Sequence, residues 1–401
     1  MRPGRSRHGA GAAVAAAADP VVPPAEPDWA VLYTPAEIAA WTTGTEYNAL
    51  SSRVNSKWGG NSRTITPKTA ITTMIGAGGT HRDDAMYAKC QAVLWAVDGS
   101  STRLAKVTEV LDSVKNVTSI TENGVALADG NGQGGNMRLE LSWTLPNLVQ
   151  AAHIIGYQDD AFDVFCRYVF PLFEWRTGGN WFASFSEARL EIAAYLRDEV
   201  RWAEAEDFFD YHITRVIYHS DYDGLSIVPV TSQYWPASKT GTVSTTLTAS
   251  HWWNAVTASP WTATYAGWTF DDGTDCEFRR DPDHESMTMA GFCNSARTIV
   301  ANGYTVPAHA HQRIKEFARF NAEKVLYYLN NSEAQLPGTP QWAYSFDGDV
   351  MKTSWFVAAT YLGVDTPADV TALTVHSAVT SNWAEGLNYL AGERMAEGSL
   401  L

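Results

Sequence analysis

The sequence feature that most constrains the fold is a succession of helical periods joined alternately by short and long connections. A first helix is expected to begin at Pro35, because Thr34 suits the N-cap and proline is tolerated in a first turn. Apolar residues then recur at helical spacing over residues 83–97, 102–115, 138–155, 159–173, 181–196, 200–217, 284–302, 308–329, 349–362, 367–376 and 382–395. The chain is therefore predicted to be all-α.

The connections between these helices predict how they are arranged. The short connections cover residues 98–101, 156–158, 197–199, 303–307 and 363–366, and the long ones cover residues 56–82, 116–137, 174–180, 218–283 and 330–348. Because consecutive antiparallel helices alternate in direction, every long loop should lie on one rim and every short turn on the other. Binding and catalytic residues concentrate on long loops held by a rigid scaffold. The pattern favours an incomplete or complete α/α toroid of antiparallel helix pairs, with its function on the long-loop rim.

The chain is predicted to consist of a leader segment and one domain. Residues 1–28 begin with a basic run, continue with small residues and end in a proline-rich stretch before Trp29. This order is typical of a secretory signal followed by an extended linker, and it predicts a secreted or periplasmic protein. Residues 29–401 are predicted to form the helical domain. The sequence contains no apolar run of roughly 18 residues, so we expect no membrane span.

The overall charge limits the classes of partner. The formal net charge of −15 argues against nucleic acid. An acidic polymer would have to be attracted by a local group of arginine, lysine and histidine residues. The 16 tryptophans are typical of sugar sites and equally of a large helical core. The sequence leaves the oligomeric state open.

The cysteines give no sign of a metal centre. All four are widely spaced and match no metal-binding pattern. Cys90, Cys166 and Cys293 occupy apolar positions of predicted helices, so we expect them to be buried free thiols. The sequence indicates neither a metal site nor a cofactor.

The densest group of chemically active residues lies where a loop rich in aspartate and glycine runs into a helix, over residues 271–305. Asp281 or Asp283 suits the N-cap of that helix, with Pro282 in its first turn. Arg280 and His284 are therefore expected together at the mouth of a helix, which is a place that favours anions.

This stretch resembles the alginate lyase family of polysaccharide lyases. The resemblance rests on Gly273, Cys276, Glu277, Arg280, Asp281, His284, Gly291, Gly303 and Tyr304, in that order. It extends to Gly179-Asn180-Trp181, where the family's asparagine opens a helix and helps to neutralise the substrate carboxylate, and to residues 218–224. The resemblance implies an α/α toroid that cleaves an acidic polysaccharide, such as alginate or a glucuronan, by β-elimination.

The chemistry of that reaction explains the residue types. A polyuronate lyase removes the C5 proton beside a carboxylate, and donors must stabilise the charge that develops there. An asparagine amide and an arginine fork suit this task, while histidine or tyrosine transfers protons. We therefore expect catalytic roles for Asn180, His219, Arg280 and His284, and substrate-binding roles for Trp181, Tyr218, Trp235, Arg279 and Trp268. His212 should lie lower, inside its helix.

One departure from the family pattern leaves the base open. Many relatives carry a tyrosine seven residues after the arginine, and here that residue is Met287. The base is then His284 or His219, or the protein is a non-catalytic relative, or a tyrosine from another loop replaces the missing one: Tyr218, Tyr222, Tyr234 or Tyr265.

The long insert over residues 221–272 has two interpretations. A Thr/Ser-rich stretch over residues 239–249 resembles a β-hairpin, and tryptophans are frequent on both sides of it. The insert either forms a lid whose aromatic rings stack on sugars, or it is a loop that packs through its tryptophans.

Two other function classes remain. An inverting glycoside hydrolase on a similar toroid would need two carboxylates flanking the bond, such as Glu277 with Asp272 or Asp283. A carbohydrate-binding or structural relative would keep the fold and lack the chemistry.

Overall fold

The computed structural model describes residues 29–72, 80–122, 124–127, 135–174, 179–217, 219, 272–273, 275 and 282–331. This part of the chain is mostly helical, as predicted. The signal-like segment, residues 221–271 of the insert and the last three predicted helices lie outside the described residues.

The helices agree with the predicted periods to within a few residues. They are α1 (Pro35–Ala40), α2 (Thr45–Trp58), α3 (Thr80–Asp98), α4 (Ser101–Val114), α5 (Gly135–Ile155), α6 (Asp160–Val169), α7 (Gly179–Leu196), α8 (Glu199–Val216), α12 (Pro282–Ala301) and α13 (Ala308–Asn331). Two 3₁₀ turns, η1 (Gly60–Ser62) and η2 (Phe170–Glu174), and three short strands, β1 (Ala70–Ile71), β2 (Ser119–Glu122) and β3 (Val125–Ala126), complete the described elements. The predicted first helix, from Pro35 to the connection at residue 56, is divided into α1 and α2.

Side-chain caps fix several of the helix starts. The predicted N-cap Thr34 is confirmed: its hydroxyl accepts a hydrogen bond from the Glu37 backbone N–H at 3.2 Å, and its own N–H donates to the Glu37 carboxylate at 2.7 Å. The carboxylates of Asp159 and Asp198 accept hydrogen bonds from backbone N–H groups in the first turns of α6 and α8. These caps satisfy N–H groups that have no partner within the helix.

Helices α5 and α7 run in the same direction. The Trp143 indole donates to the Ser184 hydroxyl at 3.1 Å. Further along both helices, the Gln150 amide donates to the Glu191 carboxylate at 2.7 Å. The residue numbers rise by the same amount on both helices between the two contacts, so the N-terminal ends of α5 and α7 lie at the same end of the molecule.

Helix α12 packs on the other side of α7 and runs in the same direction as α5 and α7. Gly291 packs on the backbone of Ala183, and the Asn294 amide donates to the Glu187 carboxylate at 2.9 Å. From the first contact to the second, the residue numbers increase on both helices, so α7 and α12 run in the same direction. At the other flank of α5, His81 near the start of α3 contacts Glu140 near the start of α5. Helices α3, α5, α7 and α12 therefore form an inner layer with their N-terminal ends together.

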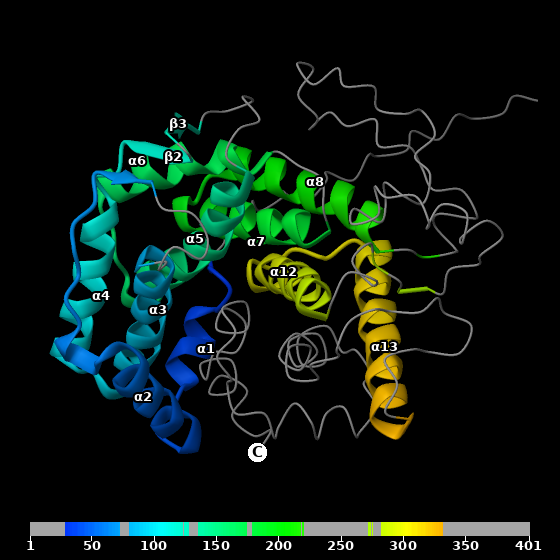
Figure 1. Ribbon diagram of the computed structural model, residues 1–401, viewed down its shortest axis with the longest axis horizontal. Helices are drawn as coiled ribbons and strands as arrows, with labels where there is room; N and C mark the ends of the chain where they lie inside the picture. Colours follow the sequence, from blue (N-terminus) through cyan, green and yellow to red (C-terminus); the bar gives the residue numbers. More distant parts are fainter. Residues whose placement is uncertain are drawn as a thin grey trace, which may run out of the picture.

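The remaining partner helices return on the outside of this layer. Short turns join α3 to α4, α7 to α8 and α12 to α13, so each outer helix is antiparallel to its inner partner. Figure 1 shows α4, α8 and α13 nearer the periphery than α3, α7 and α12. Helix α7 lies between α5, α8 and α12, and most of its residues are buried.

The long connections meet on one rim where the structure describes them. Strand β1, after α2, pairs in parallel with β2, after α4, with Ala70 opposite Ser119. After α8, Ile217 forms an antiparallel bridge with Asp275, which precedes α12. The connections after α2 and α4 therefore lie side by side, as predicted for loops on one rim.

The short turns meet at the opposite rim. The Tyr195 hydroxyl donates to the Tyr157 carbonyl at 3.2 Å, which joins the turns after α7 and α5. The Asn302 side chain, at the end of α12, accepts from the Ala30 N–H at 2.9 Å and donates to the Ala30 carbonyl at 2.8 Å. The start of the described chain is therefore fixed at the end of α12.

Two further predictions bear on the core and on membranes. Cys90, Cys166 and Cys293 are buried free thiols, as predicted, and burial raises the pKa of the Cys90 thiol to about 11. Cys276 lies outside the described residues. Within the described part of the chain, no helix is long and apolar enough to cross a membrane.

The contact between α7 and α12 provides a test of the inner layer. A Cβ on Gly291 would lie 2.5 Å from the Ala183 carbonyl carbon and 2.6 Å from its oxygen. We expect Gly291→Ala to lower the free energy of unfolding, because an overpacking cost of about 1–3 kcal/mol exceeds the roughly 1 kcal/mol that alanine contributes over glycine in a helix. Urea denaturation at neutral pH measures the change.

Gly44→Ala is the matched control. A Cβ there meets no atom within 4 Å, and the backbone is extended. Because Gly44 is the N-cap of α2, the control should lower the free energy of unfolding by no more than about 1 kcal/mol. A Gly291→Ala variant as stable as the wild type would contradict the close packing of α7 on α12.

Candidate functional site

The candidate site is the long-loop rim, where the N-terminal ends of α3, α5, α7 and α12 converge. Each N-terminal end carries backbone N–H groups without intrahelical acceptors and a partial positive charge. Several such ends close together favour an anionic ligand. The rim therefore supplies the local attraction that a chain of net charge −15 would need for an acidic substrate.

Asn180 lies in the first turn of α7, as predicted. Its side chain is fully buried. Its backbone carbonyl accepts from the Ser184 hydroxyl at 2.8 Å, and Ser184 in turn accepts from the Trp143 indole of α5. The start of α7 is therefore tied to α5 one helical turn below the rim.

His219 lies just beyond the end of α8, on the same rim. It is 3% exposed. Ile217, two residues earlier, pairs with Asp275, and its carbonyl accepts a hydrogen bond from Arg313 of α13. The segment that leads to residues 276–281 thus begins beside the end of α8, close in the chain to His219.

Gly273 packs closely against the backbone of helix α13. Its φ of +88° is in the left-handed region, and an added Cβ would lie 2.0 Å from the Glu316 carbonyl oxygen on α13. Only glycine allows both the conformation and the approach. The glycine at the start of the family-like motif therefore has a structural role in packing the segment on α13.

Helix α12 brings His284 to the rim. Gly291 lies at Ala183, so counting back along both helices places residue 288 beside Asn180. The backbone of His284 lies one turn further, about 6 Å nearer the rim. The helix begins at Pro282, as predicted.

The other predicted site residues divide into two groups. Trp181 is half-buried and packs edge-on against Phe185 of its own helix, with ring centroids 6.0 Å apart. The second group lies outside the described residues: Tyr218, Trp235, Trp268, Arg279 and Arg280, together with the side chains of His284 and Met287. The structure thus brings Asn180, His219 and the His284 backbone to one rim and leaves the arginines unplaced.

His212 lies below Asn180, as expected. Its buried ring stacks on Phe182 in the first turn of α7, with centroids 3.9 Å apart and an interplanar angle of 15°. Phe208 and Tyr211 also contact the ring. This aromatic environment favours a packing role for His212.

The sequence analysis missed a charged cluster on the rim, made by His81 and Arg82 of α3 and Glu140 of α5. The His81 Nε2 lies 3.4 Å from the Glu140 Oε1, with the two side chains 5% and 1% exposed. Burial raises the pKa of the Glu140 carboxyl to about 7, and the Arg82 charge opposes the shift. Burial likewise lowers the pKa of Arg82.

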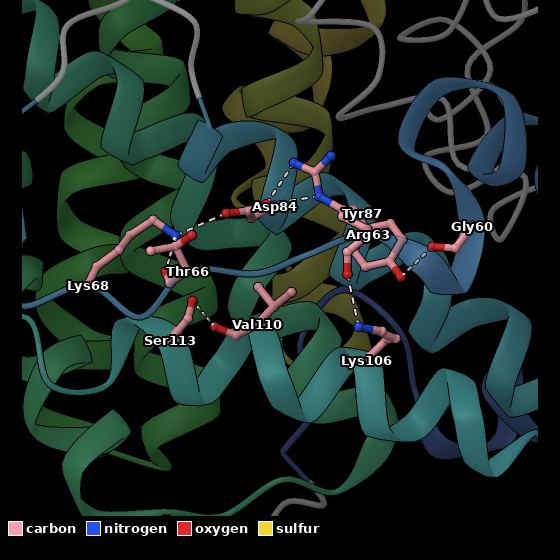
Figure 2. Close-up of polar contacts among 9 residues, drawn as sticks. All are labelled: Gly60, Arg63, Thr66, Lys68, Asp84, Tyr87, Lys106, Val110 and Ser113. Atoms are coloured by element: carbon pink, nitrogen blue, oxygen red, sulfur yellow. Dashed lines mark hydrogen bonds and ion pairs between the residues drawn. The ribbon is translucent and has the colours of Figure 1, made fainter.

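An ion-pair network fixes the α3 side of this cluster (Figure 2). Asp84 accepts from Arg63 at 2.7 and 3.0 Å and from Lys68 at 2.9 Å. Nearby, the Tyr87 hydroxyl donates to the Gly60 carbonyl at 2.9 Å. These contacts hold the loop of residues 59–72 on the first turns of α3, directly after His81 and Arg82.

A second charged layer lies deeper in the inner helices. Gln150 donates to both oxygens of Glu191, which is fully buried. Burial, and then the charge of Glu187, raise the pKa of Glu191 well above its ordinary value, while Lys89 and Arg297 oppose the shift. This layer is level with Gln150, about 15 Å further from the rim than Glu140, so its role is to join the helices.

A local signal marked the missed residues. Glu140, Glu191 and Lys89 are charged residues at positions that the helical period assigns to an apolar, buried face. A charge at a buried position requires a partner or a function. Among the described residues, no group of three or more His, Cys, Asp or Glu could hold a metal ion.

The opposite rim carries a cavity of different character. It has a volume of about 870 Å³, and its lining includes the acidic residues Asp159, Asp160, Asp163 and Glu199. Such a lining disfavours an anionic polymer. Of the two rims, the long-loop rim is the better site for an acidic ligand.

Comparisons of the chain with family models, with curated proteins and with solved structures find no match. The resemblance to alginate lyases therefore stays a prediction from the motif residues.

The raised pKa of Glu140 makes stability depend on pH. The folded state keeps a proton that the unfolded state releases between about pH 4.5 and 7, so the contribution of this carboxyl is full below pH 4.5 and is lost as pH rises through 7. We expect Glu140→Gln to remove this loss. Its free energy of unfolding relative to wild type should rise between pH 4.5 and 8 by up to about 3 kcal/mol, measured by urea denaturation.

The control for this experiment is Glu109→Gln, whose partly exposed side chain pairs with Lys106 on α4. Its free energy of unfolding should differ from that of wild type by no more than about 1 kcal/mol, the usual contribution of an exposed ion pair. Parallel curves for wild type and Glu140→Gln would show that the Glu140 carboxyl titrates normally.

Proposed function

We propose that the protein is a polysaccharide lyase that cleaves an acidic, uronic-acid-containing polysaccharide, such as alginate or a glucuronan, by β-elimination. The proposal includes the α/α toroid as the full architecture and a secreted or periplasmic location. The observation that carries it is the convergence of the N-terminal ends of α3, α5, α7 and α12 on one rim, with Asn180 and His219 beside them.

The electrostatics of this rim suit a polyanion. Helix N-terminal ends stabilise a carboxylate through backbone N–H groups and the helix dipole. A uronate polymer lying across several such ends would place one carboxylate close to Asn180. Trp181 and, from the remainder of the rim, Tyr218, Trp235, Trp268 and Arg279 would bind neighbouring sugars.

The reaction assigns a role to each catalytic residue. The Asn180 amide and the Arg280 guanidinium donate to the carboxylate of the sugar that loses its C5 proton, which stabilises the enediolate. His219 or His284 takes that proton, the C4–O4 bond breaks and a C4=C5 double bond forms. The leaving O4 receives a proton from the other histidine or from a tyrosine, so one proton is lost and one gained by the substrate.

The products test this function. The full chain is incubated with alginate, with a glucuronan and with a neutral glucan as control, and the ultraviolet absorbance of the C4=C5 uronide is recorded. We expect absorbance with at least one acidic polymer and none with the neutral glucan. Reducing ends without absorbance would favour the glycoside hydrolase, with Glu277 and Asp272 or Asp283, and no product with any polymer would favour a binding protein.

Asn180→Asp tests the role of the amide with little change of shape. The variant replaces a donor with an acceptor that repels the substrate carboxylate. On the polymer that wild type cleaves, we expect kcat/KM to fall by about 10²–10³, the usual cost of a donor to a developing oxyanion.

Asn147→Asp is the control, because Asn147 is also buried in an inner helix, where its amide donates to the Trp143 carbonyl at 2.8 Å. It should affect stability far more than the turnover of the folded fraction. A folded Asn180→Asp variant with wild-type kcat/KM would remove Asn180 from the mechanism.

A further inference from the structure

Glu140 is a buried carboxyl whose oxygens lack hydrogen-bond donors. The side chain is 1% exposed, and within the described residues no donor forms a hydrogen bond with either Oε1 or Oε2. Among the described residues, the close charged contact is His81 Nε2 at 3.4 Å, which is longer than a normal hydrogen bond. An ionised carboxylate left without donors in a buried site is strongly unfavourable.

Glu140 lies in the same layer of the inner helices as Asn180. The Trp143 indole of α5 contacts Ser184 of α7, and the Ser184 hydroxyl donates to the carbonyl of Asn180. Glu140 lies one turn before Trp143, and Asn180 lies one turn before Ser184. Glu140, in the second turn of α5, and Asn180, in the first turn of α7, therefore lie at about the same level, close to the rim where the proposed substrate lies.

Among the described residues, the charged and titratable groups facing Glu140 come from α3. They are His81, in contact, and Arg82, whose charge acts on the carboxyl. On α4, α7, β2 and η2, no described charged side chain acts appreciably on it. Because burial outweighs Arg82, the pKa of Glu140 is raised to about 7, so the carboxyl holds its proton over a large part of the physiological range.

We propose that the protonated carboxyl of Glu140 donates a hydrogen bond to the uronate carboxylate of the substrate, beside the amide of Asn180. This inference rests on the proposed function and adds a further catalytic residue to the same site. A protonated carboxyl has one O–H donor, which the unsatisfied environment of Glu140 leaves available for a ligand.

The hydrogen bond would act on the transition state. As the base removes the C5 proton, negative charge moves onto the carboxylate oxygens, so a donor placed there binds the enediolate more tightly than the ground state. The proton stays on Glu140 throughout, and no covalent bond to the residue forms or breaks. If Glu140 lost its proton, the carboxylate would repel the substrate carboxylate, and catalysis would be lost.

The test compares wild type with Glu140→Gln and Glu140→Ala across pH. Glutamine keeps an N–H donor and does not ionise, whereas alanine removes the donor. Both enzymes carry the same base, so dividing the wild-type kcat/KM by that of Glu140→Gln removes the pH dependence that comes from the base. Between pH 6 and 8.5 this ratio should fall about thirtyfold for a carboxyl of pKa about 7, and Glu140→Ala should lose about 10²-fold at pH 6.

Glu191→Gln is the matched control. Glu191 is equally buried on an inner helix but lies in the deeper layer, bound by Gln150. Its kcat/KM relative to wild type should not change with pH. A constant wild-type to Glu140→Gln ratio, a folded but inactive Glu140→Gln, or a Glu140→Ala variant with wild-type activity would each overturn the proposal.

A binding experiment separates this inference from the proposed lyase activity. If wild type makes no ultraviolet-absorbing product, alginate tetrasaccharide is titrated calorimetrically into wild type and Glu140→Gln at pH 6 and 8.5. Wild-type affinity at least tenfold weaker at pH 8.5, with no change for Glu140→Gln, would support the donor role although the lyase proposal had failed. If the affinities of wild type and Glu140→Gln changed equally with pH, or if neither protein bound the tetrasaccharide, both the donor role of Glu140 and the lyase proposal would be overturned.

Discussion

The close, same-direction packing of α3, α5, α7 and α12 is the constraint on which the rest of the structure depends. Gly291 lets the backbones of α7 and α12 approach until a methyl group would not fit, and polar contacts fix α7 against both neighbours. Helices packed in this way can follow one another in the chain only if an outer helix returns between each pair. Every N-terminal end is thereby brought to one rim, and with it a set of backbone donors that suits an anion.

The two buried carboxyls of the inner layer show how position decides the role of a residue. Glu191 receives two hydrogen bonds from Gln150 and lies near Lys89 and Arg297. These hydrogen bonds and charges specify which helix surfaces meet. Glu140 is as well buried, yet it has a 3.4 Å contact to His81 and no hydrogen bond within the described residues. Its unsatisfied oxygens lie in the layer of the rim, where a ligand could complete them.

The sequence predicted most of the described fold because the signals are local. Thr34 and Pro35 marked a helix start, and helical spacing with short turns gave the pairs and the shared rim. It missed the break between α1 and α2 and the pairing of Ala70 with Ser119, because strands of two to four residues leave no periodic signal. Glu140 was not predicted as a site residue because its contact with His81 joins two helices that are distant in the chain. The motif arginines lie outside the described residues, so their roles stay predictions.

The central claim is that an acidic polymer binds across the N-terminal ends of the inner helices. Hydrogen–deuterium exchange of the wild-type chain, with and without an excess of alginate tetrasaccharide, tests it most directly. The first-turn amides of a helix have no intrahelical acceptor, so a bound carboxylate should slow their exchange. The account predicts protection at residues 80–84, 135–141 and 179–184 and none at the turns of residues 156–159 and 197–199. Protection confined to those short turns would contradict it.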